Sequence, residues 1–68
     1  MTPKQVRARV NKIRCMAGDF EMAHSEEDKL HQDVLWHIAT GYLTIEEARD
    51  IAYEAMRTRT IKFQRACA

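Results

Sequence analysis

The sequence predicts an all-α fold, either a small three-helix bundle or a helical hairpin completed by dimerisation. Apolar residues recur at helical spacing in three successive segments, each segment opens on a helix-capping residue, and a glycine separates the last two. The 68 residues are enough for one domain, residues 1–68. A chain of this size buries about 60% of its unfolded surface, which leaves a small margin of stability.

The first helix is predicted at about 2–17, with boundaries uncertain by about two to four residues. Thr2 can cap it, Pro3 suits the first helical position, and Gln5 completes a capping box with Thr2. One apolar stripe follows at helical spacing, made of Val6, Val10, Ile13 and Ala17. Gly18 is the predicted stop.

The second helix is predicted at about 19–40. Asp19 and Ser25 are both candidate N-caps. The apolar face continues across Ser25 without a break, which favours one long helix over a loop followed by a short helix. This face comprises Phe20, Ala23, Leu30, Val34 and Ile38.

Gly41 and Thr44 predict a tight turn into a third helix, at about 44–58. We expect Gly41 to end the second helix in the left-handed conformation that glycine tolerates. Thr44 stands three residues before Glu47, the spacing of a capping box. So short a connection makes the two helices antiparallel neighbours. The residues expected to face inward are Ile45, Ala48, Ile51, Ala52, Ala55 and Met56.

The last segment, residues 59–68, has two interpretations. Thr58, Thr60 and Ile61 are β-branched, which weakens the helical preference. The segment is therefore either a frayed last turn or a tail whose Ile61 and Phe63 pack back onto the bundle.

Charge is segregated along the chain although the net charge is only +1. Residues 1–18 carry +5 and residues 19–33 carry −5. Such segregation either ties two helices together or marks a surface for a partner. Glu27 interrupts the apolar stripe of the second helix, and a buried carboxylate needs a cation. We expect an arginine of the first helix, Arg14 first and Arg7 second, to hydrogen-bond to Glu27; the alternative is that Glu27 reaches solvent.

Trp36 is the candidate centre of an interaction surface. It points away from the stripe through Leu30, Val34 and Ile38, towards the side that it shares with Met22. Exposed tryptophan and methionine are enriched at protein interfaces. Either Trp36 and Met22 form a self-association or partner surface, or the first helix or the tail covers Trp36.

A metal site and an active site find little support. His24, Asp28 and His31 share one helix face, but three ligands on one straight helix rarely converge on an ion, so a solvated polar face is favoured. Cys15 and Cys67 lack metal-finger spacing. The sequence contains no nucleophile–base set and no glycine-rich phosphate loop. We therefore expect a non-enzyme without a metal or cofactor.

Nucleic-acid binding is the alternative function. The first helix offers five cations but no aromatic residue for base stacking; these are Lys4, Arg7, Arg9, Lys12 and Arg14. Gly41 fits the turn of a helix-turn-helix motif. The helix after it, however, would present acidic groups to the phosphates, namely Glu46, Glu47, Asp50 and Glu54.

Three stretches resemble a group of short helical proteins of actinobacteria and their phages: residues 2–10, residues 27–35 with 38–41, and residues 57–63. The resemblance implies no activity or site, only a phage or mobile-element context. No apolar run approaches the roughly 18 residues of a membrane span, and residues 1–10 lack a secretory signal. We expect a cytoplasmic interaction module that binds a host protein or itself, in a host cell if phage-encoded.

Overall fold

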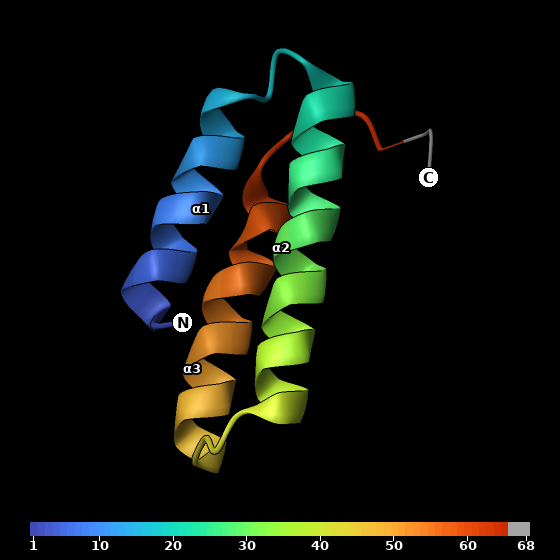
Figure 1. The fold of residues 1–68 in the computed structure, drawn as a ribbon. Coiled ribbons are helices and arrows are strands. Elements are labelled where there is room, and N and C mark those ends of the chain that lie inside the picture. The colour runs from blue at the N-terminus through green and yellow to red at the C-terminus, as the bar shows by residue number, and fades with distance from the viewer. Residues whose placement is uncertain (66–68) are drawn as a thin grey trace.

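Three helices pack side by side around one core in a computed structural model that describes residues 1–65 (Figure 1). They are α1 (Pro3–Cys15), α2 (Phe20–Thr40) and α3 (Ile45–Met56), and the 3₁₀ turn η1 (Arg57–Thr60) follows. Successive helices run in opposite directions, so the C-terminal segment leaves the bundle at the end where α1 joins α2. The predicted all-α class is confirmed, and the single chain forms a three-helix bundle.

The predicted capping box starts α1. The Thr2 hydroxyl accepts a hydrogen bond from the Gln5 backbone N–H at 3.2 Å, and the Gln5 side chain accepts one from the Thr2 N–H at 2.9 Å. The helix ends at Cys15, two residues earlier than predicted. There Met16 donates its N–H to the Ile13 carbonyl in a tighter, 3₁₀-type turn.

One uninterrupted helix crosses Ser25, as the continuous apolar face predicts. Asp19 is the N-cap of α2, and its carboxylate accepts the Met22 N–H at 3.2 Å. A carboxylate at this position is also favoured by the partial positive charge of a helix N-terminus. The alternative of a loop followed by a short helix is therefore wrong.

Gly41 ends α2 as expected, but the predicted left-handed conformation is wrong. Its backbone is extended, with φ −89° and ψ 166°. Its N–H donates to the His37 carbonyl at 2.8 Å, and a Cβ at Gly41 would lie 2.7 Å from that same oxygen. Glycine is needed here because the chain passes too close to the last turn of α2 for any side chain.

The second predicted capping box starts α3. The Thr44 hydroxyl accepts the Glu47 N–H and the Glu47 carboxylate accepts the Thr44 N–H, both at 3.1 Å. Beyond α3 and η1 the segment Ile61–Arg65 packs back onto the bundle: Ile61 is buried and Phe63 contacts the core. The packed tail is thus the correct alternative up to residue 65; the end of the predicted tail and Cys67 lie outside the described residues.

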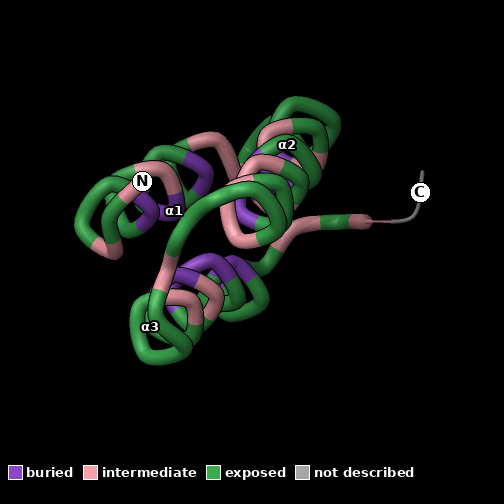
Figure 2. Tube along the Cα trace, turned by 60° about the horizontal axis from the view of Figure 1, so that its bottom comes forward, coloured by how far each residue is buried: buried purple, intermediate pink, exposed green. Residues whose placement is uncertain are grey.

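All three helices and the C-terminal segment contribute to the core (Figure 2). Its buried apolar residues are Val6, Val10 and Ile13 of α1, Ala23, Leu30 and Val34 of α2, Ile51 and Ala55 of α3, and Ile61. Three residues predicted to face inward are exposed: Phe20, Ile45 and Met56. Phe20 is the first residue of α2, Met56 lines a groove between α2 and α3, and Ile45 at the start of α3 is 77% exposed.

Among residues 1–65, no helix combines the length and the apolar character that crossing a membrane requires.

The two glycines provide a matched test of the α2–α3 turn. Gly41→Ala should lower the free energy of unfolding by about 1 kcal/mol or more, because the new Cβ collides with the His37 carbonyl. Gly18→Ala places its Cβ in open space. It should be neutral or stabilise by up to about 1 kcal/mol, because it restricts the unfolded chain. Thermal or urea unfolding measures both changes, and equal stability of the two variants would contradict the assigned contact.

Candidate functional site

Glu27 is buried, as its place in the apolar stripe suggests, but its predicted partner is wrong. The residue is 5% exposed, and its carboxylate is held by Arg65, not by Arg14 or Arg7. Arg65 Nε donates to Oε1 at 2.9 Å and Nη2 donates to Oε2 at 3.1 Å. This two-pronged geometry is the strongest that a carboxylate and a guanidinium can adopt.

The arginines expected at Glu27 lie on the flank of α1 that faces α3. Arg7 forms a two-pronged ion pair with Glu54 of α3, with N–O distances of 3.3 and 3.2 Å. Arg14 bonds to Asn11 at 2.8 Å and to the Thr60 hydroxyl at 3.5 Å. Because Arg7 and Arg14 are seven residues apart, they share one side of the helix, and both bond to residues of α3 or η1.

Arg65 fastens the C-terminal segment to the bundle. Besides Glu27, its Nη2 donates to the carbonyls of Thr58 at 3.0 Å and Ile61 at 3.2 Å. Its guanidinium lies 3.8 Å from the centre of the Phe63 ring, a cation–π contact. These contacts keep Ile61 in the core, where it closes the end of the bundle.

The three residues considered for a metal do not converge. His31 Nε2 lies 3.2 Å from both the Ala55 carbonyl and the Thr58 hydroxyl of the neighbouring α3–η1 segment. His24 and Asp28 stay together, with 3.7 Å between Nε2 and Oδ1. Within residues 1–65, no three potential ligands from histidine, cysteine, aspartate or glutamate come together. His31 instead connects α2 to α3.

Both buried glutamates are held in their charged form. Burial raises the pKa of Glu27, but hydrogen bonds from Arg65 and Thr58 and the charges of Arg65 and His31 outweigh this and bring it below its ordinary value. The hydrogen bond from Arg7 lowers the pKa of Glu54, against the effect of burial and with help from Arg57. Each carboxylate is thus a charged link between two parts of the fold.

Three of the five cations of α1 have partners within the fold. Arg7 and Arg14 bond to Glu54 and Thr60, as described above. Arg9 forms an ion pair with Asp33 of α2 at 2.9 Å. The basic segment 1–18 is therefore tied directly to the acidic segment 19–33, in agreement with one interpretation of their opposite charges. Lys4 and Lys12 are exposed.

Trp36 and Met22 are exposed, at 71% and 51%. Neither α1 nor the C-terminal segment to residue 65 covers Trp36, so that alternative is wrong for the described residues; the end of the predicted tail lies outside them. The two side chains lie on similar sides of α2 but are 14 residues apart, which corresponds to about 21 Å along the helix. The structure therefore does not bring them together into one compact patch, and their role as an interaction surface stays a prediction.

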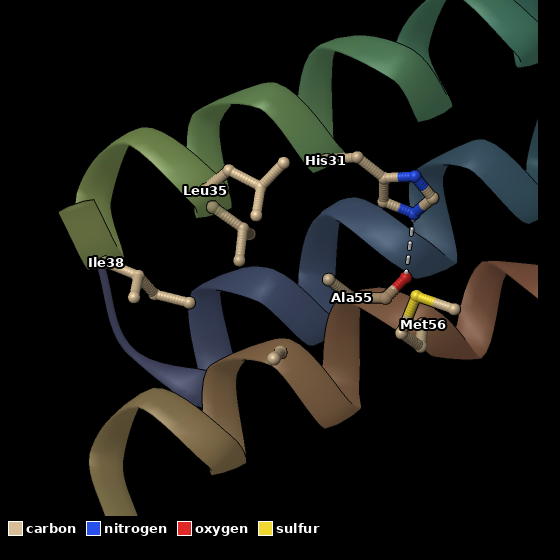
Figure 3. A pocket seen from close by; sticks show the side chains of 7 residues that line it. His31, Leu35, Ile38, Ala55 and Met56 are labelled. Carbon is tan, nitrogen blue, oxygen red and sulfur yellow. Dashed lines mark hydrogen bonds between the residues drawn. The ribbon is translucent and has the colours of Figure 1, made fainter. Parts of the chain in front are cut away.

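A groove between α2 and α3, with a volume of about 210 Å³, is the clearest candidate site. Its lining is His31, Val34, Leu35, Ile38, Ala52, Ala55 and Met56. In Figure 3, Leu35 and Ile38 extend from α2 towards α3, and α1 passes behind them. Leu35 and Met56 are 67% and 47% exposed. On the α3 side, the small side chains of Ala52 and Ala55 line the groove. None of the lining residues is aspartate, glutamate, lysine or arginine, so the groove suits an apolar group.

The sequence held a signal for this groove. The predicted inward stripe of the third helix is wide: Ile45, Ala52 and Met56 lie within about 40° of one another and well away from Ile51. In the structure α1 and the core side of α2 cover only the Ile51 side. Ala48 and Ala52 are partly buried, and Ile45 and Met56 are exposed, at 77% and 47%.

Comparisons with protein families, with curated proteins and with solved structures found no match for this chain. The geometry of the groove and of the buried ion pairs is therefore the basis of the functional proposal.

The pairing of Glu27 with Arg65 can be tested by a double-mutant cycle. Glu27→Gln and Arg65→Gln should couple by about 1 kcal/mol or more in the free energy of unfolding, because each removes half of a partly buried ion pair. Glu27→Gln and Arg14→Gln should be additive to within about 0.5 kcal/mol. Urea unfolding gives both values. Strong coupling to Arg14 with additivity at Arg65 would contradict the observed pairing.

Acid should destabilise the bundle through the same carboxylates. A glutamate whose pKa is lowered by folding stabilises the fold above its ordinary value of 4.5 and loses that contribution as the pH falls through its folded value. We expect the Tm to fall as the pH is lowered from neutral through 4.5. In Glu27→Gln/Glu54→Gln the decline should be shallower. Parallel Tm curves for parent and variant would show that other groups dominate acid unfolding.

Proposed function

We propose that this chain is a small, non-enzymatic protein-interaction module that binds an apolar helical segment in the groove between α2 and α3. The observation that carries the proposal is a mostly apolar groove, without aspartate, glutamate, lysine or arginine among its lining residues, whose walls include exposed Leu35 and Met56. An amphipathic helix placed in an apolar groove is a recurring mode of recognition, in which side chains at positions i, i+3, i+4 and i+7 act as anchors.

The exposed apolar residues around the groove support this proposal. Ile45 follows the same side of α3 as Met56, and Tyr42 stands in the adjoining turn; both are exposed. Single exposed apolar residues are ordinary on a protein surface, but a group of them beside a hollow is typical of interaction sites. Burying Leu35 and Met56 against a partner would remove their apolar surface from water, which favours association.

The groove favours binding over catalysis. Among the described residues that line the groove, His31 alone carries a group that could act as an acid or a base, and its Nε2 already contacts the Ala55 carbonyl and the Thr58 hydroxyl. A histidine held in this way has no adjacent nucleophile to activate among the residues of the groove. The groove therefore offers shape and apolar surface.

Nucleic-acid binding through α1 is the second candidate, and the exposure of Lys4 and Lys12 favours it. The ion pairs of Arg7 with Glu54 and of Arg9 with Asp33 count against it, because these carboxylates already offset two of the five positive charges. DNA retention that falls steeply with salt would support this candidate.

The resemblance to short proteins of actinobacteria and their phages gives the proposal a biological context. The partner would then be a host protein in the host cell cytoplasm, or the chain itself. This context extends the groove proposal and does not determine the chemistry of the site.

A matched pair of substitutions tests the groove. Leu35 and Trp36 are neighbours on α2 with similar exposure, but only Leu35 lines the groove. Helical peptides selected from a random library on the immobilised protein should carry apolar residues at i, i+3, i+4 and i+7. Leu35→Glu should weaken their binding at least about tenfold, because it places a charge in the apolar groove.

Trp36→Glu is the control, and it should leave the peptide affinity unchanged within about twofold. Far-UV circular dichroism would show that both variants remain helical. Peptides that lose binding to Trp36→Glu and keep binding to Leu35→Glu would move the site to the Trp36–Met22 side. The absence of any selected apolar peptide would overturn the proposal.

A further inference from the structure

We propose that the groove binds a second copy of this chain, so that α2 and α3 of two copies form an antiparallel four-helix arrangement. The inference rests on the proposed function, because it names the partner of the same groove. It follows from the register of α2 against α3, from the shapes of the groove residues and from the charges at one end of the groove.

The register is fixed by the contact of His31 with α3. His31 Nε2 lies 3.2 Å from the Ala55 carbonyl and from the Thr58 hydroxyl, so these residues stand at one level along the bundle. Moving four residues along α2, or about 6 Å, reaches Leu35. Because α3 runs the opposite way, the same distance measured from the middle of the stretch between Ala55 and Thr58 reaches the turn that contains Ala52. Leu35 and Ala52 are therefore level across the groove.

The groove face is self-complementary because a large residue, Leu35, and a small one, Ala52, lie at the same level on its two sides. A two-fold axis along the groove places α2 of one copy opposite α3 of the other and keeps every residue at its own level. The exposed Leu35 then faces Ala52 of the second copy, where the small side chain leaves room for it. The same contact is repeated on the other side of the axis. A protruding leucine thus meets an alanine twice in one interface.

The charges near the His31 end follow the same symmetry. Asp28 precedes Leu35 by seven residues, so it lies within about 20° of Leu35 on the groove side of α2. Arg59 follows Met56 by three residues in η1, where three residues complete a turn. Asp28 precedes His31 by three residues in α2, and Arg59 directly follows Thr58 in η1. Because the two segments run in opposite directions and His31 is level with Thr58, Asp28 and Arg59 lie at about the same level along the bundle. The two-fold axis therefore places Asp28 opposite Arg59 of the second copy.

Helix direction also favours this arrangement. Each α2 would have α3 of its own chain and α3 of the other chain as neighbours, and both run antiparallel to it. Antiparallel neighbours bring opposite ends of the helix dipoles together. A parallel α2–α2 contact along the same groove would lack this advantage and would set Leu35 against Leu35.

The size of the face predicts a weak dimer. The groove side of the α2–α3 pair is about 20 Å long and about 20 Å wide, since each helix is about 10 Å across. This is of the order of 400 Å² per copy, half of the roughly 800 Å² per partner in a standard stable interface. Dimerisation should therefore appear only at high concentration and should be readily reversible.

Sedimentation equilibrium from micromolar to millimolar protein tests the association. The weight-average mass of the parent should rise towards twice that of one chain, and Trp36→Glu should behave in the same way. Leu35→Glu should remain a monomer throughout, because it places a carboxylate opposite an alanine in an apolar contact. A parent that remains monomeric at millimolar concentration, or a Leu35→Glu variant that dimerises like the parent, would overturn the inference.

Cysteine pairing tests the geometry in chains that also carry Cys15→Ser and Cys67→Ser. A mixture of Leu35→Cys and Ala52→Cys chains should form the mixed disulfide in at least about fivefold excess over either homodimer, because a disulfide requires Cα atoms within about 7 Å. Trp36→Cys mixed with Ala52→Cys is the control and should show no preference. Preferential Leu35→Cys homodimers would overturn the antiparallel arrangement.

These outcomes separate the inference from the function on which it rests. A monomeric parent that still binds the selected peptides through Leu35 would overturn self-association and leave the groove a site for other proteins. A monomeric parent that binds no apolar peptide would overturn both.

Discussion

The ion pair between Glu27 and Arg65 is the contact on which the end of this bundle depends. The side chain of Glu27 is 7% exposed, so its carboxylate loses most of its hydration, and an opposite charge must compensate for that loss. Arg65 supplies the charge, and at the same time binds the carbonyls of Thr58 and Ile61. The path of the C-terminal segment is therefore determined by the position of the Arg65 guanidinium against the Glu27 carboxylate. Ile61 enters the core because the chain has to reach that position.

Glu54 repeats this arrangement between α1 and α3. Glu54 is also buried, and Arg7, from a distant part of the chain, donates two hydrogen bonds to it. Arg57 adds a third hydrogen bond at 3.2 Å. Replacing a buried ion pair by apolar residues often costs nothing, whereas removing one partner is expensive. In a domain this small, such pairs fix the relative positions of the elements that they join. Arg7 fixes α1 relative to α3, and Arg65 fixes the C-terminal segment relative to α2.

Local interactions could be predicted from the sequence, and distant ones could not. The two capping boxes, at Thr2 and Thr44, involve residues three positions apart, so the spacing alone indicates them. Glu27 and Arg65 are 38 residues apart, and charge segregation pointed to the arginines of the first helix instead. Gly41 was identified as a helix stop, but its reason is the nearby His37 carbonyl and not its own dihedral angles. The groove was missed because Ile45 and Met56 share the spacing of core residues, and spacing does not reveal which side of a helix has a neighbour.

The position of Arg65 in the chain has a consequence for how the protein is made. A ribosome synthesises the three helices first, and Glu27 lacks its partner Arg65 until residue 65 has been added and has left the exit tunnel. Before that moment the nascent bundle has Ile61 outside its core and a carboxylate in an apolar stripe, a combination that favours an open and loosely packed chain. Completion of the fold is thus coupled to completion of this segment, and a truncated product would carry its defect as exposed apolar surface, the feature that cellular chaperones and proteases recognise.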